Sequence, residues 1–213
     1  MSFSQVQVAP LFTTPLLTEV WAESITALGP LRAAILDRQR QTAGVQLSNV
    51  LGWQSDDRMP EWGGDAAGRL LAHVQGRCDA ATRDLEGNRP RWISNMWANT
   101  SQPGASNQTH SHPGAYWSAV YYVEDGYGGS PDRALGGELV FLDPRMPMVR
   151  ARTPDLRWRK PDGRHDSQEV WFRPVAGRVV MFPSWLMHSV RPYRGQGLRI
   201  SIAMNFTPRF EAA

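Results

Sequence analysis

Within residues 1–90 the apolar positions follow the period of amphipathic helices. Across residues 20–41 apolar side chains recur every three or four positions, which is typical of a helix with one buried face. The dipeptide Gly29-Pro30 is expected to break or kink that helix. A second helix is predicted over residues 65–85 by the same spacing. The connection between them, SNVLGWQSDD, is predicted to be rich in turns.

From residue 91 the pattern changes to short β-branched and aromatic runs separated by Gly, Pro and Asp. The runs are RWISNMWANT, WSAVYYV, GELVFLD, EVWFRPV, RVVMFP and RISIAMNF. Six such runs predict a mainly β fold with N-terminal helices, built as an antiparallel sandwich or jelly roll. A chain of 213 residues fits a single domain, 1–213, with a helical supporting part at 1–90 and a strand-rich core at 91–207.

Charge gives no sign of a nucleic-acid partner. Lys and Arg number 23 against 20 Asp and Glu, a net charge of +3, and charged residues make up an ordinary 20% of the chain. The densest basic stretch, residues 145–173, has acidic residues interleaved with its Lys and Arg, which favours a solvated loop over a polyanion site.

Cysteine content and hydropathy favour a cytoplasmic protein without a membrane partner. The chain has 1 cysteine, Cys78, and therefore forms no internal disulfide. The first residues lack the charged and apolar regions of a secretory signal. No apolar stretch approaches the length of a membrane span.

Three histidines form a candidate metal centre. The segment THSHPGAYWSAVYYV, residues 109–123, contains His110 and His112 directly before a strand-like run. Residues i and i+2 of an extended strand point to one face, so both imidazoles can reach one metal ion. His188 follows another such run in FPSWLMHSVRP, and remote ligands of this kind close metal sites in β-barrels. Three unrelated packing or surface histidines are the simpler alternative.

The run RISIAMNF begins with Arg199. Alternation places Arg199 and Ser201 on one face and the aliphatic residues on the other. If the aliphatic face packs under the helices, Arg199 points into the barrel, where a guanidinium needs an anionic partner. That partner is either the carboxylate of a ligand, with the Ser201 hydroxyl as a further donor, or an internal Asp or Glu.

The order of the motifs along the chain resembles that of the iron(II)/2-oxoglutarate-dependent oxygenases. The motifs are H-x-H, the YY-containing strand, GGELVF, GRVVMFPSWLMHSV and RISIAMNF. The resemblance is strongest to a bacterial group distantly similar to prolyl 4-hydroxylases, and it covers residues 90–207. It implies a cupin-like double-stranded β-helix that binds Fe(II) and the co-substrate 2-oxoglutarate and hydroxylates a substrate, with release of succinate and CO₂.

By position, the resemblance assigns metal-binding roles to His110 and His188, and assigns the distal carboxylate of 2-oxoglutarate to Arg199 and Ser201. The sequence departs from the family motif at His112, where Asp or Glu is usual. In one interpretation His112 is itself a ligand of a three-histidine site. In another, His112 does not bind the metal and only donates a hydrogen bond near it, while water fills the third ligand position. In the third interpretation the altered ligand set marks lost oxygenase chemistry or a preference for Zn²⁺.

Tyr122 is an even number of residues from His110 and His112, so in an extended chain its side chain points to the same face, and it is a candidate to contact the co-substrate. The alternative is that Tyr122 is an aromatic residue of the core. Two other classes remain open. One is a cupin-like dioxygenase that does not use 2-oxoglutarate, and the other is a non-enzymatic jelly-roll binding protein. The expected partner is a small-molecule or peptide substrate, and a homodimer is left open.

Overall fold

The computed structural model describes Ala9 and residues 11–145 and 155–209. The helices are α1 (Ser24–Gln41), α2 (Met59–Trp62) and α3 (Gly64–Ala81), with a 3₁₀ turn, η2, at Arg133–Leu135. The strands are β1 (Leu17–Val20), β2 (Asn49–Gln54), β3 (Arg91–His110), β4 (Trp117–Glu124), β5 (Leu139–Leu142), β6 (Glu169–Phe172), β7 (Arg178–Pro183), β8 (His188–Val190) and β9 (Arg199–Arg209).

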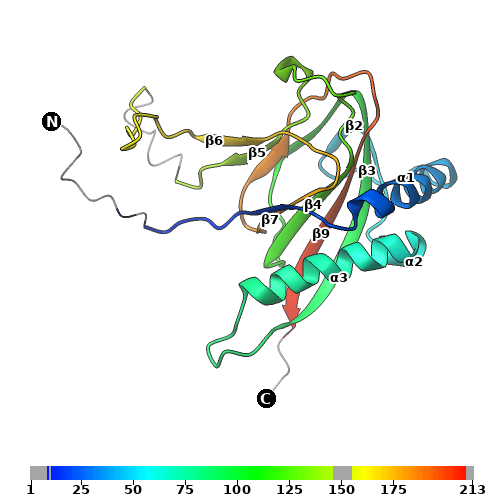
Figure 1. Cartoon of the computed structure of the whole chain (residues 1–213), viewed down its shortest axis with the longest axis horizontal. Coiled ribbons are helices and arrows are strands. Elements are labelled where there is room, and N and C mark those ends of the chain that lie inside the picture. Colours follow the sequence, from blue (N-terminus) through cyan, green and yellow to red (C-terminus); the bar gives the residue numbers. More distant parts are fainter. Residues whose placement is uncertain (1–8, 10, 146–154, 210–213) are drawn as a thin grey trace.

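The strands form one antiparallel sheet in the order β1-β7-β4-β9-β3-β8-β5-β6, and β2 pairs with β3 beside this path. Residues 91–101 of β3 pair with β9, whereas Asn107 and His110 near its end pair with β8. Because this long strand belongs to both halves of the sheet, the sheet curls into the half-barrel of a jelly roll (Figure 1). The predicted mainly β fold with N-terminal helices is confirmed.

Helices α1 and α3 cover one face of the curled sheet (Figure 1). Leu31 and Ile35 of α1 and Leu70 and Val74 of α3 are fully buried in the same core as the aliphatic side chains of β9. Each such side chain stabilises the fold by about 1.5–3 kcal/mol relative to an exposed one. The helices thus fix the outer face of the sheet and leave its inner face free to line a site.

Helix α1 runs without interruption through Pro30, so of the break or kink predicted at Gly29-Pro30 the break does not occur. Pro30 is exposed, while Ala27, Leu31 and Ile35 are buried along the other side of the helix. The burial of this apolar face outweighs the one main-chain hydrogen bond that proline removes. Helix α3 ends at Ala81, earlier than predicted, because Thr82 is extended.

The alternation predicted for the last run is confirmed in β9. Ile200 and Ile202 belong to the core beneath the helices, whereas Arg199 and Ser201 line the cavity on the opposite face. The sequence therefore placed the guanidinium of Arg199 on the correct side of the sheet.

The segment predicted as a turn-rich connection contains strand β2, so that prediction is wrong for residues 49–54. Its side chains lack a regular alternation of apolar and polar residues, and Gly52 lies at an irregularity in its pairing with β3. Pairing with β3 makes it a strand, because β3 offers free main-chain groups that the sequence of β2 does not reveal.

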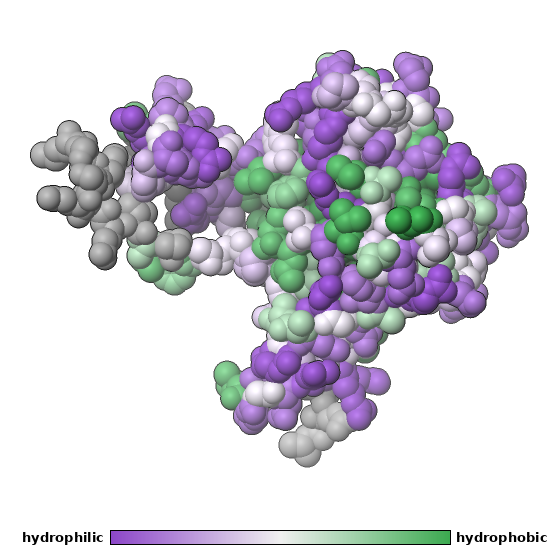
Figure 2. All heavy atoms as spheres, in the orientation of Figure 1, coloured by the Kyte–Doolittle hydropathy of each residue, from purple (hydrophilic) through white to green (hydrophobic). Residues whose placement is uncertain are grey.

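Between β5 and β6 the described part of the connection, which includes residues 155–168, forms an arm that extends away from the barrel (Figure 1). Its described end is mainly hydrophilic (Figure 2), as predicted for the basic stretch with interleaved acids. Residues 146–154, within that stretch, lie outside the described residues, and none of residues 155–167 lines the cavity. Among the described helices, none combines the length and apolarity required of a membrane span.

Candidate metal centre and co-substrate pocket

Three histidines meet where β3 ends and β8 begins. His110 is the last residue of β3 and lies directly opposite His188, the first residue of β8. The potential ligand nitrogens of His110, His112 and His188 all lie within 4.8 Å of one another. The ring centroids are 4.4 Å apart for His110 and His188, and 5.0 and 5.1 Å from these to His112. The predicted convergence of three imidazoles is present.

His112 reaches this point from a loop rather than from the strand. β3 ends at His110, and the main-chain N–H of His112 donates to the carbonyl of Ser184 at 2.9 Å. The Ser184 hydroxyl in turn donates to the carbonyl of Ala115. The expectation of one extended strand through both histidines was wrong, but the loop returns the His112 ring to the same cluster.

Two of the rings are oriented by main-chain carbonyls. Nδ1 of His110 lies 2.7 Å from the carbonyl oxygen of Gln108, and Nδ1 of His188 lies 2.8 Å from that of Leu186. A carbonyl accepts only, so each Nδ1 carries the proton and each Nε2 presents a lone pair. This arrangement is the one that metal-binding histidines commonly adopt.

The environment keeps the imidazoles of His112 and His188 neutral. Burial lowers the pKa of His112 to about 4, and the adjacent His110 contributes in the same direction. Burial likewise lowers the pKa of His188 to about 3, against the carbonyl of Leu186, which favours the charged form. Because the neutral form is the metal ligand, both rings are ready to bind without losing a proton at neutral pH.

The cluster contains no carboxylate from the described residues. Phe182 packs against His188 with ring centroids 4.8 Å apart, and Trp97 lies 5.8 Å from His112. The donor set is thus three imidazoles beside aromatic walls, a set suited to Fe(II) or Zn²⁺.

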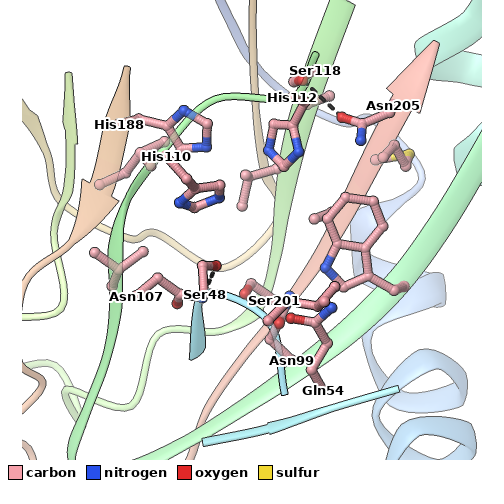
Figure 3. Close-up of a pocket in the computed structure, with 18 of the residues that line it drawn as sticks. Ser48, Gln54, Asn99, Asn107, His110, His112, Ser118, His188, Ser201 and Asn205 are labelled. Atoms are coloured by element: carbon pink, nitrogen blue, oxygen red, sulfur yellow. Dashed lines mark hydrogen bonds between the residues drawn. The ribbon is translucent and has the colours of Figure 1, made fainter. Parts of the chain in front are cut away.

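A cavity of about 750 Å³ opens beside the histidines (Figure 3). Its floor is the inner face of β3, β9 and β4, whose side chains stand in three rows across the strands. From β3 through β9 to β4 the rows are Asn95, Asn205 and Ser118; then Trp97, Ala203 and Val120; then Asn99, Ser201 and Tyr122.

Arg199 lines the cavity one same-face position beyond Ser201 on β9. It is only 2% exposed, and its Nε has no hydrogen-bond partner. Within the described part of the chain no carboxylate forms an ion pair with it, so the internal salt bridge considered from the sequence is absent there. A buried guanidinium without an anion is costly, and the cavity is where an anion can reach it.

Tyr122 faces the cavity and Tyr121 faces the helices, as strand alternation requires. The Tyr122 hydroxyl is buried without a hydrogen-bond partner, and the Arg199 guanidinium carbon lies 5.4 Å from the Tyr122 ring centroid. Burial raises the pKa of Tyr122, although the charge of Arg199 acts in the opposite direction. The phenol is therefore a neutral donor directed toward the same region as Arg199.

The sequence did not reveal the contribution of β2 to this cavity. Gln54 and Ser55, at the end of β2 and just beyond it, line the cavity together with Asp56 and Asp57. Asp56 is engaged by Arg38 at 2.5 Å, and Asp57 accepts from Asn95 at 3.2 Å. Only a recognised pairing of β2 with β3 would have brought these residues to the site.

Residues 95–205 match a protein family described as "Putative 2OG-Fe(II) oxygenase". This segment contains all three histidines, Arg199, Ser201 and Tyr122. No curated protein matches the sequence.

The fold is similar to solved oxygenase structures. A Pseudomonas putida prolyl-4-hydroxylase is 19% identical, with 93% of this chain and 95% of that chain covered and a TM-score of 0.63. A prolyl hydroxylase from Trichoplax adhaerens, in complex with a hypoxia inducible factor peptide fragment, is 15% identical, with coverages of 92% and 84% and a TM-score of 0.61. HygX from Streptomyces hygroscopicus, with nickel, 2-oxoglutarate and hygromycin B bound, is 15% identical, with coverages of 93% and 84% and a TM-score of 0.58.

These likenesses confirm the double-stranded β-helix fold, and the family match covers more than half of the chain. The protein belongs to the 2OG-Fe(II) oxygenase family and is a dioxygenase whose cofactors are Fe(II) and 2-oxoglutarate. The expectation from the sequence is confirmed at this level.

Proposed function

We propose that the protein is a hydroxylase in which His110, His112 and His188 bind Fe(II), while Arg199, Ser201 and Tyr122 bind 2-oxoglutarate. The observation that carries this proposal is the pairing of two features in one cavity. A cluster of three imidazoles lies at one side, and a buried guanidinium that pairs with no carboxylate of the described residues lies at the other. A metal ion and a dicarboxylate satisfy both features together.

The residues present fit both groups. The Nε2 atoms of His110 and His188 are left free by the hydrogen bonds of their Nδ1 atoms. Arg199, with its planar fork of donors, suits a carboxylate, and the hydroxyls of Ser201 and Tyr122 supply further donors from the adjacent row. Among the interpretations of His112, direct ligation is favoured because its ring is equidistant from the other two.

When bound, Fe(II) and 2-oxoglutarate would supply an oxidation that consumes one O₂: one oxygen atom would enter the succinate formed from 2-oxoglutarate as CO₂ is released, and the other would convert a substrate C–H bond to C–OH. The protein's own contribution is to orient and shield. Main-chain carbonyls fix the imidazoles, Arg199 fixes the co-substrate's distal end, and the aromatic walls of Trp97 and Phe182 keep the inner part of the site dry.

A small molecule or a peptide side chain is the proposed substrate class. The cavity volume of about 750 Å³ accommodates a co-substrate and a further group of moderate size. Similar folds bind both kinds of ligand, a peptide fragment in the Trichoplax hydroxylase and hygromycin B in HygX. The polar row with Asn95 and Asn205 is suited to orient such a group by hydrogen bonds.

Turnover of 2-oxoglutarate tests this proposal. Protein reconstituted with Fe(II) is expected to form succinate slowly without added substrate, whereas Zn(II)-loaded protein forms none. His188→Ala is expected to lose this activity, and the exposed His165, outside the cavity, provides the matched control His165→Ala. Iron bound at one equivalent without any succinate would instead favour a dioxygenase that does not use 2-oxoglutarate.

A further inference from the structure

Gln54 is a buried residue whose amide opens onto the cavity and has no protein partner among the described residues. It is 5% exposed, it lines the cavity, and within the described residues its side chain has no hydrogen-bond partner. Polar side chains buried to this degree are nearly always paired. An amide in this position is satisfied only by what occupies the cavity.

Gln54 also lies outside the segment that matches the family. The match begins at residue 95, whereas Gln54 is the last residue of β2. The pairing of β2 with β3 therefore brings to the site a polar group from outside the matched segment.

The sheet register places Gln54 in line with the proposed co-substrate residues. Gln54 lies opposite Asn99 of β3, Asn99 lies opposite Ser201 of β9, and Ser201 lies opposite Tyr122 of β4. Directly opposite residues have Cβ atoms about 4.5–5.5 Å apart. Figure 3 shows Gln54, Asn99 and Ser201 gathered at one end of the pocket, with the three histidines toward the other.

Asn99, although only half-buried, is a second amide of the cavity without a protein partner. Its side chain lines the cavity, and among the described residues no hydrogen-bond partner reaches it. By contrast, Asn95, Asn107 and Asn205 each bond another side chain of the cavity wall. The two free amides therefore belong to the row of Ser201 and Tyr122, between Arg199 and the level of the histidines.

We infer that Gln54 and Asn99 bind 2-oxoglutarate through their amide N–H groups, which donate to its carboxylate oxygens. Each amide offers two donors, and a dianion offers strong acceptors to them, whereas the carboxylates of Asp56 and Asp57 in the cavity wall are engaged by Arg38 and Asn95. Hydrogen bonds to a charged group are stronger than those between neutral groups, so loss of either amide is expected to weaken binding measurably. This inference rests on the proposed function, and it gives β2 the task of closing the co-substrate pocket.

The test is calorimetric titration of 2-oxoglutarate into Mn(II)-loaded protein. Gln54→Met, which keeps the length of the side chain and removes its donors, is expected to raise the Kd at least tenfold, and Asn99→Ala is expected to do the same. Gln54→Glu, which places a carboxylate against the ligand, is expected to raise the Kd at least a hundredfold. Mn(II) affinity is expected to stay within threefold of the wild-type value in all three.

Gln102→Met, at an exposed position of β3 outside the cavity, controls for the substitution itself. A Kd within threefold of wild type in folded Gln54→Met, or equal losses in Gln54→Met and Gln54→Glu, overturns the inference, because a purely structural glutamine does not sense charge on the ligand. If Mn(II)-loaded wild-type protein binds no 2-oxoglutarate, the proposed function itself fails.

Discussion

Replacing Arg199 with methionine is expected to change two measurable quantities in opposite directions. In the ligand-free protein, Arg199→Met removes a 2% exposed guanidinium whose Nε is unpaired and which has no carboxylate partner among the described residues. Leaving such a group buried costs about 1–3 kcal/mol or more, and its contact with the Tyr122 ring at 5.4 Å returns about 0.5–1 kcal/mol. The variant is therefore expected to be more stable by roughly 1–2 kcal/mol.

For a chain of this length, each kcal/mol corresponds to about 2–4 °C in Tm. In the same variant, loss of a charge-assisted pair of hydrogen bonds worth about 3–4 kcal/mol is expected to raise the Kd for 2-oxoglutarate roughly 10²–10³-fold. Thermal denaturation of metal-free protein and calorimetric titration of the Mn(II)-loaded form measure the two effects.

Arg194→Met, at an exposed arginine close to Arg199 in the chain, is the matched control and is expected to change neither quantity. A lower Tm in metal-free Arg199→Met would mean that the guanidinium has a stabilising partner inside the protein. That result would refute the argument that the cavity is built around a missing anion.

Three further changes probe the metal centre and the scaffold. His112→Asp adds a negative charge to the donor set, so the Kd for Fe(II) is expected to fall about tenfold, which is about 1.4 kcal/mol of binding free energy. Competition with a chelator measures this Kd, and unchanged affinity and turnover would argue against ligation by His112. Burial would raise the pKa of Glu19, but hydrogen bonds and positive charge from Arg77 and His73 outweigh it, and the net pKa lies below 4.5. Above pH 4.5 the wild type is therefore expected to be more stable than Glu19→Gln by roughly 1 kcal/mol, and this difference is expected to disappear as pH falls through the lowered pKa. Urea titrations across pH 3–7 measure the free energy of unfolding of both proteins. A difference that stays constant with pH would contradict this linkage. Pro30→Ala restores a main-chain N–H donor at an exposed position of α1, so the free energy of unfolding is expected to rise by about 1–3 kcal/mol. A decrease in the free energy of unfolding would show that proline is required at that position.

The candidate site was largely predictable because its residues stand in regular strands. Alternation placed Arg199 and Ser201 on the inner face of β9, and the same rule directed Tyr122 inward and Tyr121 outward. The spacing of two histidines before one run, with a third after another, predicted the cluster that β3 and β8 bring together.

The parts that were missed depend on long-range pairing. β2 has no strand-like pattern of its own and forms because β3 offers it a partner, so the role of Gln54 was invisible to local reasoning. The continuity of α1 through Pro30 depends on the core beneath the helix. The position of His112 depends on a loop held by the carbonyl of Ser184 and on no feature of its neighbours in sequence.

The central claim is that one cavity holds Fe(II) on three histidines and 2-oxoglutarate on Arg199. The most direct measurement is the visible absorption spectrum of anaerobic Fe(II)-loaded protein as 2-oxoglutarate is added. A charge-transfer band is expected in the wild type and in His165→Ala, and it is expected to be lost in His188→Ala and Arg199→Met at the same 2-oxoglutarate concentration. Bound iron with no band, or a band that survives both substitutions, would contradict the assignment.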